Sequence, residues 1–132
     1  MAVSFHDLEH TGSPLNGGKL ADAADIATLL DRLIHRPPFV FELRGDTHFK
    51  LTIGIARDRG FAQHSSCDGS PPYLVALATE PAANRDVIEF LTGGTLTPID
   101  RRFILPIATL RTIVESFVAD GSASAAVSWA EI

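Results

Sequence analysis

The chain has 132 residues, a formal net charge of −5, and 45% hydrophobic and 20% charged residues. This length and composition are typical of one soluble domain with its own core, so we expect residues 1–132 to form a single domain. No apolar run approaches the ~18 residues of a membrane-spanning helix and the N-terminus lacks a signal-peptide pattern, so we expect a cytoplasmic protein with no membrane partner.

The N-terminal third is predicted to contain a strand, a loop and a helix. Residues 3–8 suit a first strand, and residues 10–18 form a loop because they are rich in glycine and also contain proline and asparagine. Between residues 20 and 34, apolar side chains recur at the spacing of one helix face, which predicts an amphipathic helix. The two prolines at 37 and 38 end this helix, because the residue before a proline avoids helical angles.

The middle of the chain is predicted to be a set of antiparallel strands. Residues 39–44 and 48–56 alternate between apolar and polar side chains, so one face is expected to lie on a core and the other to face water or a partner. Further strands are predicted at residues 61–66, 73–79 and 87–91, and turns or loops at 57–60, 67–72, 80–86 and 92–97.

The C-terminal quarter is predicted to be a helix followed by a short strand. Pro106 suits the first turn of a helix, and Gly121 is a candidate for its C-terminal cap. The helix presents one apolar stripe, formed by Ile107, Leu110, Val114, Phe117 and Val118. Residues 125–130 alternate with period two, which predicts a strand that carries Trp129, packed beneath the helix.

These elements predict an α+β fold with a single antiparallel or mixed sheet. We expect about five to seven strands, with the two helices packed on one face of the sheet.

The sequence contains no recognisable catalytic or cofactor motif. Its histidines lack the spacing of metal ligands, and the single cysteine, Cys67, excludes an intrachain disulfide and a cysteine-rich zinc site. We therefore expect no cofactor and no metal. Two alternatives stay open: a small hydrolase that uses His64 and Cys67, and an adaptor domain that binds a protein through an exposed strand.

The C-terminal helix and strand also resemble a known family. An apolar–proline pair opens the helix, a phenylalanine and a glycine close it, and a short strand ends on tryptophan. The residues that carry the resemblance are Leu105, Pro106, Phe117, Gly121, Val127 and Trp129. This arrangement resembles the C-terminal signature of immunity protein family one, which groups bacterial antitoxins encoded beside polymorphic toxins, many of them nucleic-acid deaminases.

The resemblance implies a protein that is not an enzyme and that binds a cognate toxin domain 1:1, covering its active site. The net charge of −5 argues against a nucleic-acid partner and favours a basic protein surface. Acidic loop residues can match the charge that phosphates supply to a toxin's substrate groove, and an aromatic residue at a loop edge can anchor an interface. The expected toxin-binding residues are Asp58, Asp68, Tyr73, Glu80 and Asp86.

Overall fold

The computed structural model describes residues 3–46, 48–79 and 87–132, which form one sheet and two α-helices. The helices are α1 (Ala23–Leu33) and α2 (Ile107–Asp120), and a short 3-10 helix, η1, spans Arg101–Phe103. The strands are β1 (Val3–Asp7), β2 (Lys19–Leu20), β3 (Phe39–Gly45), β4 (Phe49–Ala56), β5 (Arg59–Ser66), β6 (Leu74–Ala76), β7 (Ile88–Thr92), β8 (Thr95–Ile99), β9 (Leu105–Pro106) and β10 (Trp129–Glu131). The predicted α+β class is confirmed.

The sheet is built around three long antiparallel strands. Its order is β10-β6-β5-β4-β3-β1-β2, with β9 paired to the start of β5. The β7–β8 hairpin joins β3 through one parallel pair, Phe39 with Leu91. The described residues form ten strands, more than predicted, because four of the strands have only two or three residues. Segments this short carry no readable period-two pattern.

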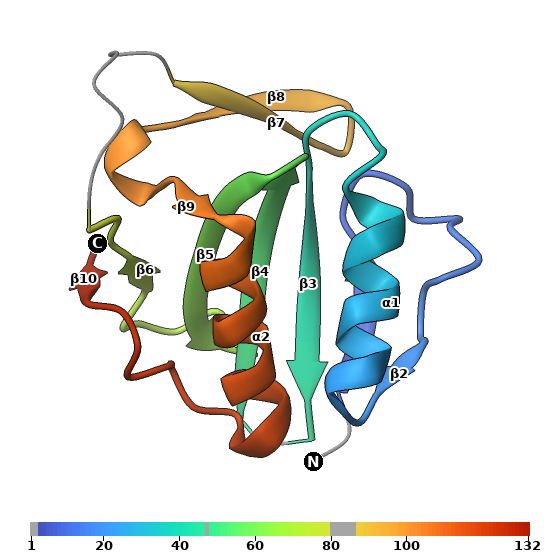
Figure 1. The fold of residues 1–132 in the computed structure, drawn as a ribbon, viewed down its shortest axis with the longest axis horizontal. Helices are drawn as coiled ribbons and strands as arrows, with labels where there is room; N and C mark the ends of the chain where they lie inside the picture. The colour runs from blue at the N-terminus through green and yellow to red at the C-terminus, as the bar shows by residue number, and fades with distance from the viewer. Residues whose placement is uncertain (1–2, 47, 80–86) are drawn as a thin grey trace.

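Both helices cover the same face of the sheet, as predicted (Figure 1). Their apolar stripes pack on the inward side chains of the long strands, forming the main core. The fully buried members of largest volume are Phe5, Phe39, Phe41, Phe117, Ile26, Leu30, Leu33, Leu43, Leu51, Ile53 and Ile55. Burial of these apolar side chains is the main favourable contribution to folding.

Helix α1 begins three residues later than predicted. Leu20 belongs to β2, and the helix starts after Asp22, whose carboxylate accepts a 2.9 Å hydrogen bond from the N–H of Asp25. The carboxylate of Asp25 in turn accepts a 3.0 Å hydrogen bond from the N–H of Ala21. This reciprocal capping fixes the start of the helix more strongly than the apolar spacing does.

The second face of the sheet is only partly open. At one end, Val40, Ala56 and Phe61 are buried under Phe90 of the β7–β8 hairpin. The rings of Phe61 and Phe90 meet edge to face with centroids 5.0 Å apart. The prediction that this whole face meets water or a partner is therefore wrong at this end, because Thr95–Ile99 forms a strand where a continuous turn had been expected.

The predicted strand over residues 125–130 is shorter in the structure. Helix α2 ends at Gly121, which takes the left-handed conformation with φ 79°. A turn follows, in which the hydroxyl of Ser124 accepts from the N–H of Ala126 and its carbonyl accepts from the indole N–H of Trp129. Only Trp129–Glu131 then joins the sheet, and Trp129 packs half-buried against the main core.

Candidate functional site

The tip of the β4–β5 hairpin lies where the ends of the two helices meet. Arg57 and Asp58 form its two-residue loop, and Ala56 pairs with Arg59 across it. The carbonyl oxygen of Asp58 accepts a 2.7 Å hydrogen bond from the N–H of Ile107, at the start of α2. Arg59 and Gly60 also pair with β9, which directly precedes α2. Two sets of backbone contacts therefore attach the hairpin tip to the start of the helix.

Arg57 has a backbone conformation that is unusual for its type. Its φ of 59° makes it the one residue other than glycine with positive φ in the described chain. This region costs an L-amino acid about 1–2 kcal/mol relative to ordinary angles. This conformation lets the two-residue loop close the hairpin, and Asp58 at the tip has an arginine on each side in the sequence.

Two adjoining hollows flank the hairpin tip and share His35, Arg57 and Asp58; we call them together the hairpin groove. The larger hollow has a volume of about 930 Å³ and the smaller about 440 Å³. The larger is lined by His35, Arg36, Pro37, Pro38, Ala56, Arg57, Asp58, Arg59 and Ile88. The smaller is lined by Leu30, Asp31, Ile34, His35, Arg57, Asp58, Ile107 and Arg111.

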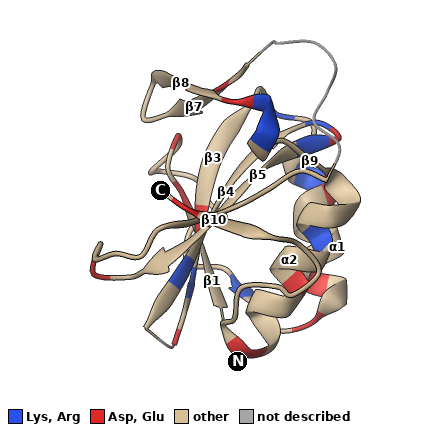
Figure 2. Cartoon of the chain, turned by 90° about the vertical axis from the view of Figure 1, so that its left-hand side faces the viewer, with Lys and Arg blue, Asp and Glu red and all other residues tan. Residues whose placement is uncertain are grey.

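The charge of the hairpin groove is opposite to that of the whole chain. Among its described lining residues, four arginines (36, 57, 59 and 111) face two aspartates (31 and 58), in a protein of net charge −5. In Figure 2, segments that carry lysine or arginine, drawn in one colour, lie near β9 and α2. Apolar side chains such as Ile34 and Ile107 lie between the charges, so the groove combines an apolar floor with a charged rim.

The four arginines differ in how they are held. Within the described chain, Arg57 and Arg59 are exposed and their side chains have no hydrogen bond or ion pair. Arg111 lies 4.0 Å from the carboxylate of Asp31, and its Nε is a buried donor without an acceptor in that part of the chain. A donor in this state is costly to leave unpaired.

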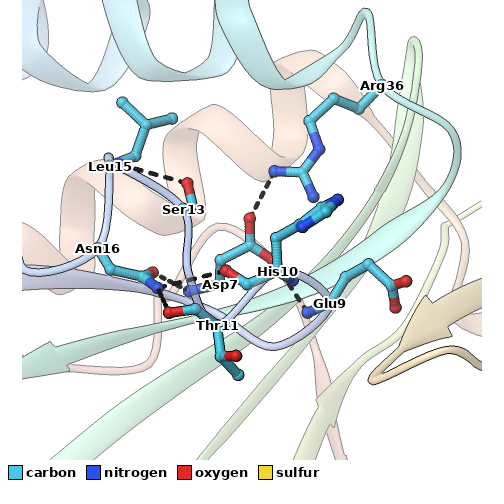
Figure 3. A network of polar contacts seen from close by, with 8 residues as sticks. All are labelled: Asp7, Glu9, His10, Thr11, Ser13, Leu15, Asn16 and Arg36. Atoms are coloured by element: carbon cyan, nitrogen blue, oxygen red, sulfur yellow. Dashed lines mark hydrogen bonds and ion pairs between the residues drawn. The ribbon is translucent and has the colours of Figure 1, made fainter.

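Arg36 is fixed by a buried network that starts in β1 (Figure 3). Its Nη1 contacts Asp7 Oδ2 at 2.5 Å, and its guanidinium lies 3.6 Å from the centre of the Phe39 ring. The other carboxylate oxygen of Asp7 accepts from the N–H groups of Glu9 and His10 at 2.9 and 2.7 Å. Burial alone would raise the pKa of Asp7, but the hydrogen bond from Arg36 and these backbone donors outweigh it and lower the pKa.

Asn16 connects the same network to the preceding loop. Its Oδ1 accepts a 2.7 Å hydrogen bond from the N–H of Asp7, and its Nδ2 donates to the carbonyl oxygens of His10 and Thr11. The loop before β2 is therefore tied to the buried carboxylate that holds Arg36 (Figure 3). One wall of the hairpin groove is fixed in this way.

The predicted toxin-binding residues fall into separate places. Asp58 lies in the hairpin groove, whereas Asp68 and Tyr73 lie in the loop after the opposite end of β5. Eight residues of β5 separate the two ends, which corresponds to about 26 Å of extended chain. Glu80 and Asp86 lie outside the described residues.

Asp68 organises its own loop. Its Oδ1 accepts hydrogen bonds from the hydroxyl and N–H of Ser70 and from the hydroxyl of Ser66. These donors hold the pKa of the Asp68 carboxyl well below its usual range, those of Ser70 first. The half-buried Tyr73 donates its hydroxyl hydrogen to the carbonyl oxygen of Gly69, within the same loop. Asp68 therefore presents a permanent exposed negative charge.

His64 and Cys67 do not form an activated pair. The Nε2–H of His64 donates a 2.9 Å hydrogen bond to the carbonyl oxygen of Gly121, and the buried ring packs against Phe49 and Phe117. The thiol of Cys67 is exposed at the loop. In the described ranges, no group of three or more histidine, cysteine and acidic residues gathers as metal ligands, and no helix is long and apolar enough to span a membrane.

Sequence reasoning missed the arginines of the hairpin groove. Arg57 and Arg59 flank Asp58 directly, and this charge alternation at a turn was the available signal. Arg36 and Arg111 come from the ends of two helices that are far apart in sequence, so their meeting depends on the packing of α1 against α2.

The immunity protein Imm1 family matches residues 19–131. The chain belongs to the immunity protein Imm1 family. A comparison with curated proteins finds no match.

Membership gives the protein the role of an immunity protein, and such a protein has a toxin as its partner. The match covers both helices, β2–β10 and the whole β4–β5 hairpin. Strand β1 and the loop that follows it lie before the matched region, so Asp7 reaches Arg36 from outside the Imm1 match.

Proposed function

We propose that this protein neutralises a cognate bacterial toxin by stoichiometric binding and carries out no chemistry of its own. The observation that carries the proposal is the Imm1 match over residues 19–131, which takes in nearly the whole fold. The buried position of the His64 ring supports a binding role over the hydrolase alternative, because an activated nucleophile needs the imidazole within hydrogen-bond reach of the thiol, and the described side-chain hydrogen bond of His64 goes to Gly121 and not to Cys67.

The proposed toxin is a nucleic-acid deaminase that acts in the cytoplasm. A deaminase receives an extruded base or a single strand in a pocket, so an inhibitor that covers this pocket blocks access of the substrate. A 1:1 interface of ordinary size, about 800 Å² on each partner, is sufficient for this purpose.

The proposed contact residues are the exposed acidic groups near both ends of β5, with Tyr73 beside them. Asp68 supplies a charge that does not titrate near neutral pH, and Asp58 lies at the hairpin tip. Glu80 and Asp86 belong to the same proposal. Acidic groups suit a toxin surface that binds phosphates, because complementary charge raises the association rate and disfavours wrong partners.

Co-expression with the toxin encoded beside the gene tests the proposal. We expect growth to be rescued and the two proteins to co-purify as a 1:1 complex. Growth arrest in the presence of soluble, folded protein would contradict it. A catalytically inactive toxin variant serves as the control for expression, since it should co-purify without any growth effect.

A further inference from the structure

We propose that the hairpin groove binds an acidic surface segment of the toxin, whose carboxylates pair with Arg57, Arg59 and Arg111. This inference rests on the proposed function for the identity of the partner. The acidic contacts proposed above match a basic region of the toxin; the hairpin groove matches an adjacent acidic region, and Asp58, which belongs to both surfaces, pairs with a basic side chain at their boundary.

The first argument is that the side chains of Arg57 and Arg59 have no partner among the described residues. The guanidinium groups of Arg57 and Arg59 have no ion pair or hydrogen bond in the described chain, and both residues are exposed at the groove. Two neighbouring arginines on a fixed turn suit carboxylates, because the planar guanidinium binds them through paired N–H donors.

The second argument is the state of Arg111. Its Nη2 has only a distant contact with Asp31, at 4.0 Å, and its Nε has no acceptor in the described chain. A carboxylate that reaches the groove after a small rotation of this side chain supplies the missing acceptor. The start of α2 at Ile107 also lines the groove and adds the positive end of the helix dipole.

The third argument is the shape and the rigidity of the hairpin groove. The hollows adjoin one another, with volumes of about 930 and 440 Å³, and have apolar residues such as Ile34 and Ile107 in the floor. The hairpin tip is bonded to α2, and Arg36 is held by Asp7. A fixed groove loses little conformational freedom on binding, which favours affinity.

The aspartates of the groove favour a protein segment over a nucleic acid. Asp31 and Asp58 lie among the arginines, and the chain as a whole carries net charge −5. A phosphate backbone repeats its negative charge at every nucleotide, so some phosphates would be repelled by these two carboxylates. A protein segment can instead place a basic or neutral side chain beside each carboxylate.

A peptide titration tests the groove without the toxin. The probe is a hexapeptide that alternates glutamate with glutamine, so that neutral side chains can lie beside Asp31 and Asp58; it is added to the full chain and followed by NMR of backbone amides and arginine Nε–H groups. We expect shifts at Arg57, Arg59 and Arg111 that vanish at 0.5 M salt (roughly a 4 Å screening length) and in the double variant Arg57→Gln, Arg59→Gln. Absence of these shifts would overturn the inference, and so would tighter binding of a single-stranded oligonucleotide at the same residues.

Toxin binding provides the second arm. The double variant Arg57→Glu, Arg59→Glu should bind the toxin at least tenfold more weakly, and Lys19→Glu, an exposed reversal on β2, should bind within twofold of the parent. The neutral Arg57→Gln, Arg59→Gln pair covers the case in which the reversal impairs folding. Parent-like affinity of folded double variants, with the toxin still inhibited, would overturn the groove assignment and leave the immunity role intact. If the parent chain itself does not bind the toxin, the proposed function fails and the peptide titration decides the groove alone.

Discussion

The N–H of Ile107 donates a 2.7 Å hydrogen bond to the carbonyl oxygen of Asp58, and this contact joins the first residue of α2 to the β4–β5 hairpin tip. The bond satisfies one of the donors that a helix start leaves unpaired, in a helix whose N-cap, Pro106, makes no side-chain capping bond. It also fixes the position of the two arginines that flank Asp58. The hydrogen bond between Ile107 and Asp58 therefore connects a core helix to the proposed recognition surface.

Arg57→Gly is expected to stabilise the fold and weaken toxin binding. Glycine takes a φ near 59° without the steric cost that arginine has. Thermal denaturation should therefore show a free energy of unfolding that is about 1 kcal/mol higher than that of the parent. The matched variant Arg59→Gly lies in β5, where glycine should cost about 1 kcal/mol. Equal destabilisation by both variants would show that the conformation of Arg57 is not strained.

Asp7→Asn is expected to destabilise the fold by about 3 kcal/mol at pH 7, because it leaves the Arg36 guanidinium without its buried carboxylate partner. Urea denaturation of both proteins measures the difference. Asp22→Asn, an exposed carboxylate whose amide replacement still accepts the helix-capping hydrogen bond, is the control and should change stability by less than about 1 kcal/mol.

The cost of Asp7→Asn should depend on pH in one direction. The folded-state pKa of Asp7 is lowered from its ordinary value of 3.8, so its contribution is complete above that value and is lost as the pH falls through the folded pKa. The difference in the free energy of unfolding between the parent and the variant should be constant from neutral pH down to the ordinary pKa of the carboxyl and should become smaller below it. A gap that widens on acidification would contradict the assignment of Asp7 as a stabilising carboxylate.

The elements with strong periodic patterns were predictable from sequence. The stripe of α2 and the alternation of β3 and β4 reflect burial on one side, which the sequence records directly. The strand predicted at residues 125–130 was wrong in its first part because Ser124 forms a side-chain turn with Ala126 that the alternation does not reveal. Helix α1 began later than predicted because a capping box decides its start.

The candidate site was predictable only in part. Asp58 was singled out from its place in a loop and lines both hollows of the hairpin groove, while its role in toxin binding stays a prediction. The contact of Asp7 with Arg36 joins residues 29 apart, and the approach of Arg111 to the hairpin depends on how two helices pack. Long-range contacts of this kind are fixed by tertiary packing, which local spacing does not encode.

Asp68→Asn is expected to slow association with the toxin without unfolding the loop. The asparagine oxygen still accepts from Ser66 and Ser70, so only the charge is removed. Loss of one complementary charge should lower the association rate about fivefold at low salt. Stopped-flow mixing with the toxin measures this rate, and Glu115→Gln, an exposed change on α2, should leave it unaltered. An association rate equal to that of the parent would remove Asp68 from the proposed contact surface.

Cys67→Ser is expected to leave growth protection unchanged. The thiol is exposed whereas the His64 ring is buried, and among the described residues no hydrogen bond joins them, which an activated nucleophile requires. A plate assay that compares survival of cells carrying the toxin with either protein measures the effect. Loss of protection by a folded Cys67→Ser protein would revive the hydrolase alternative.

Titration of the enzymatic activity of the proposed deaminase toxin with the purified protein tests the central claim most directly. At toxin concentrations well above the dissociation constant, the proposed mechanism predicts a linear fall in activity that reaches zero at one equivalent, with no recovery on further incubation. Activity that persists at a large excess would contradict inhibition by binding. Complete inactivation by a small fraction of an equivalent would instead show that the protein acts as a catalyst.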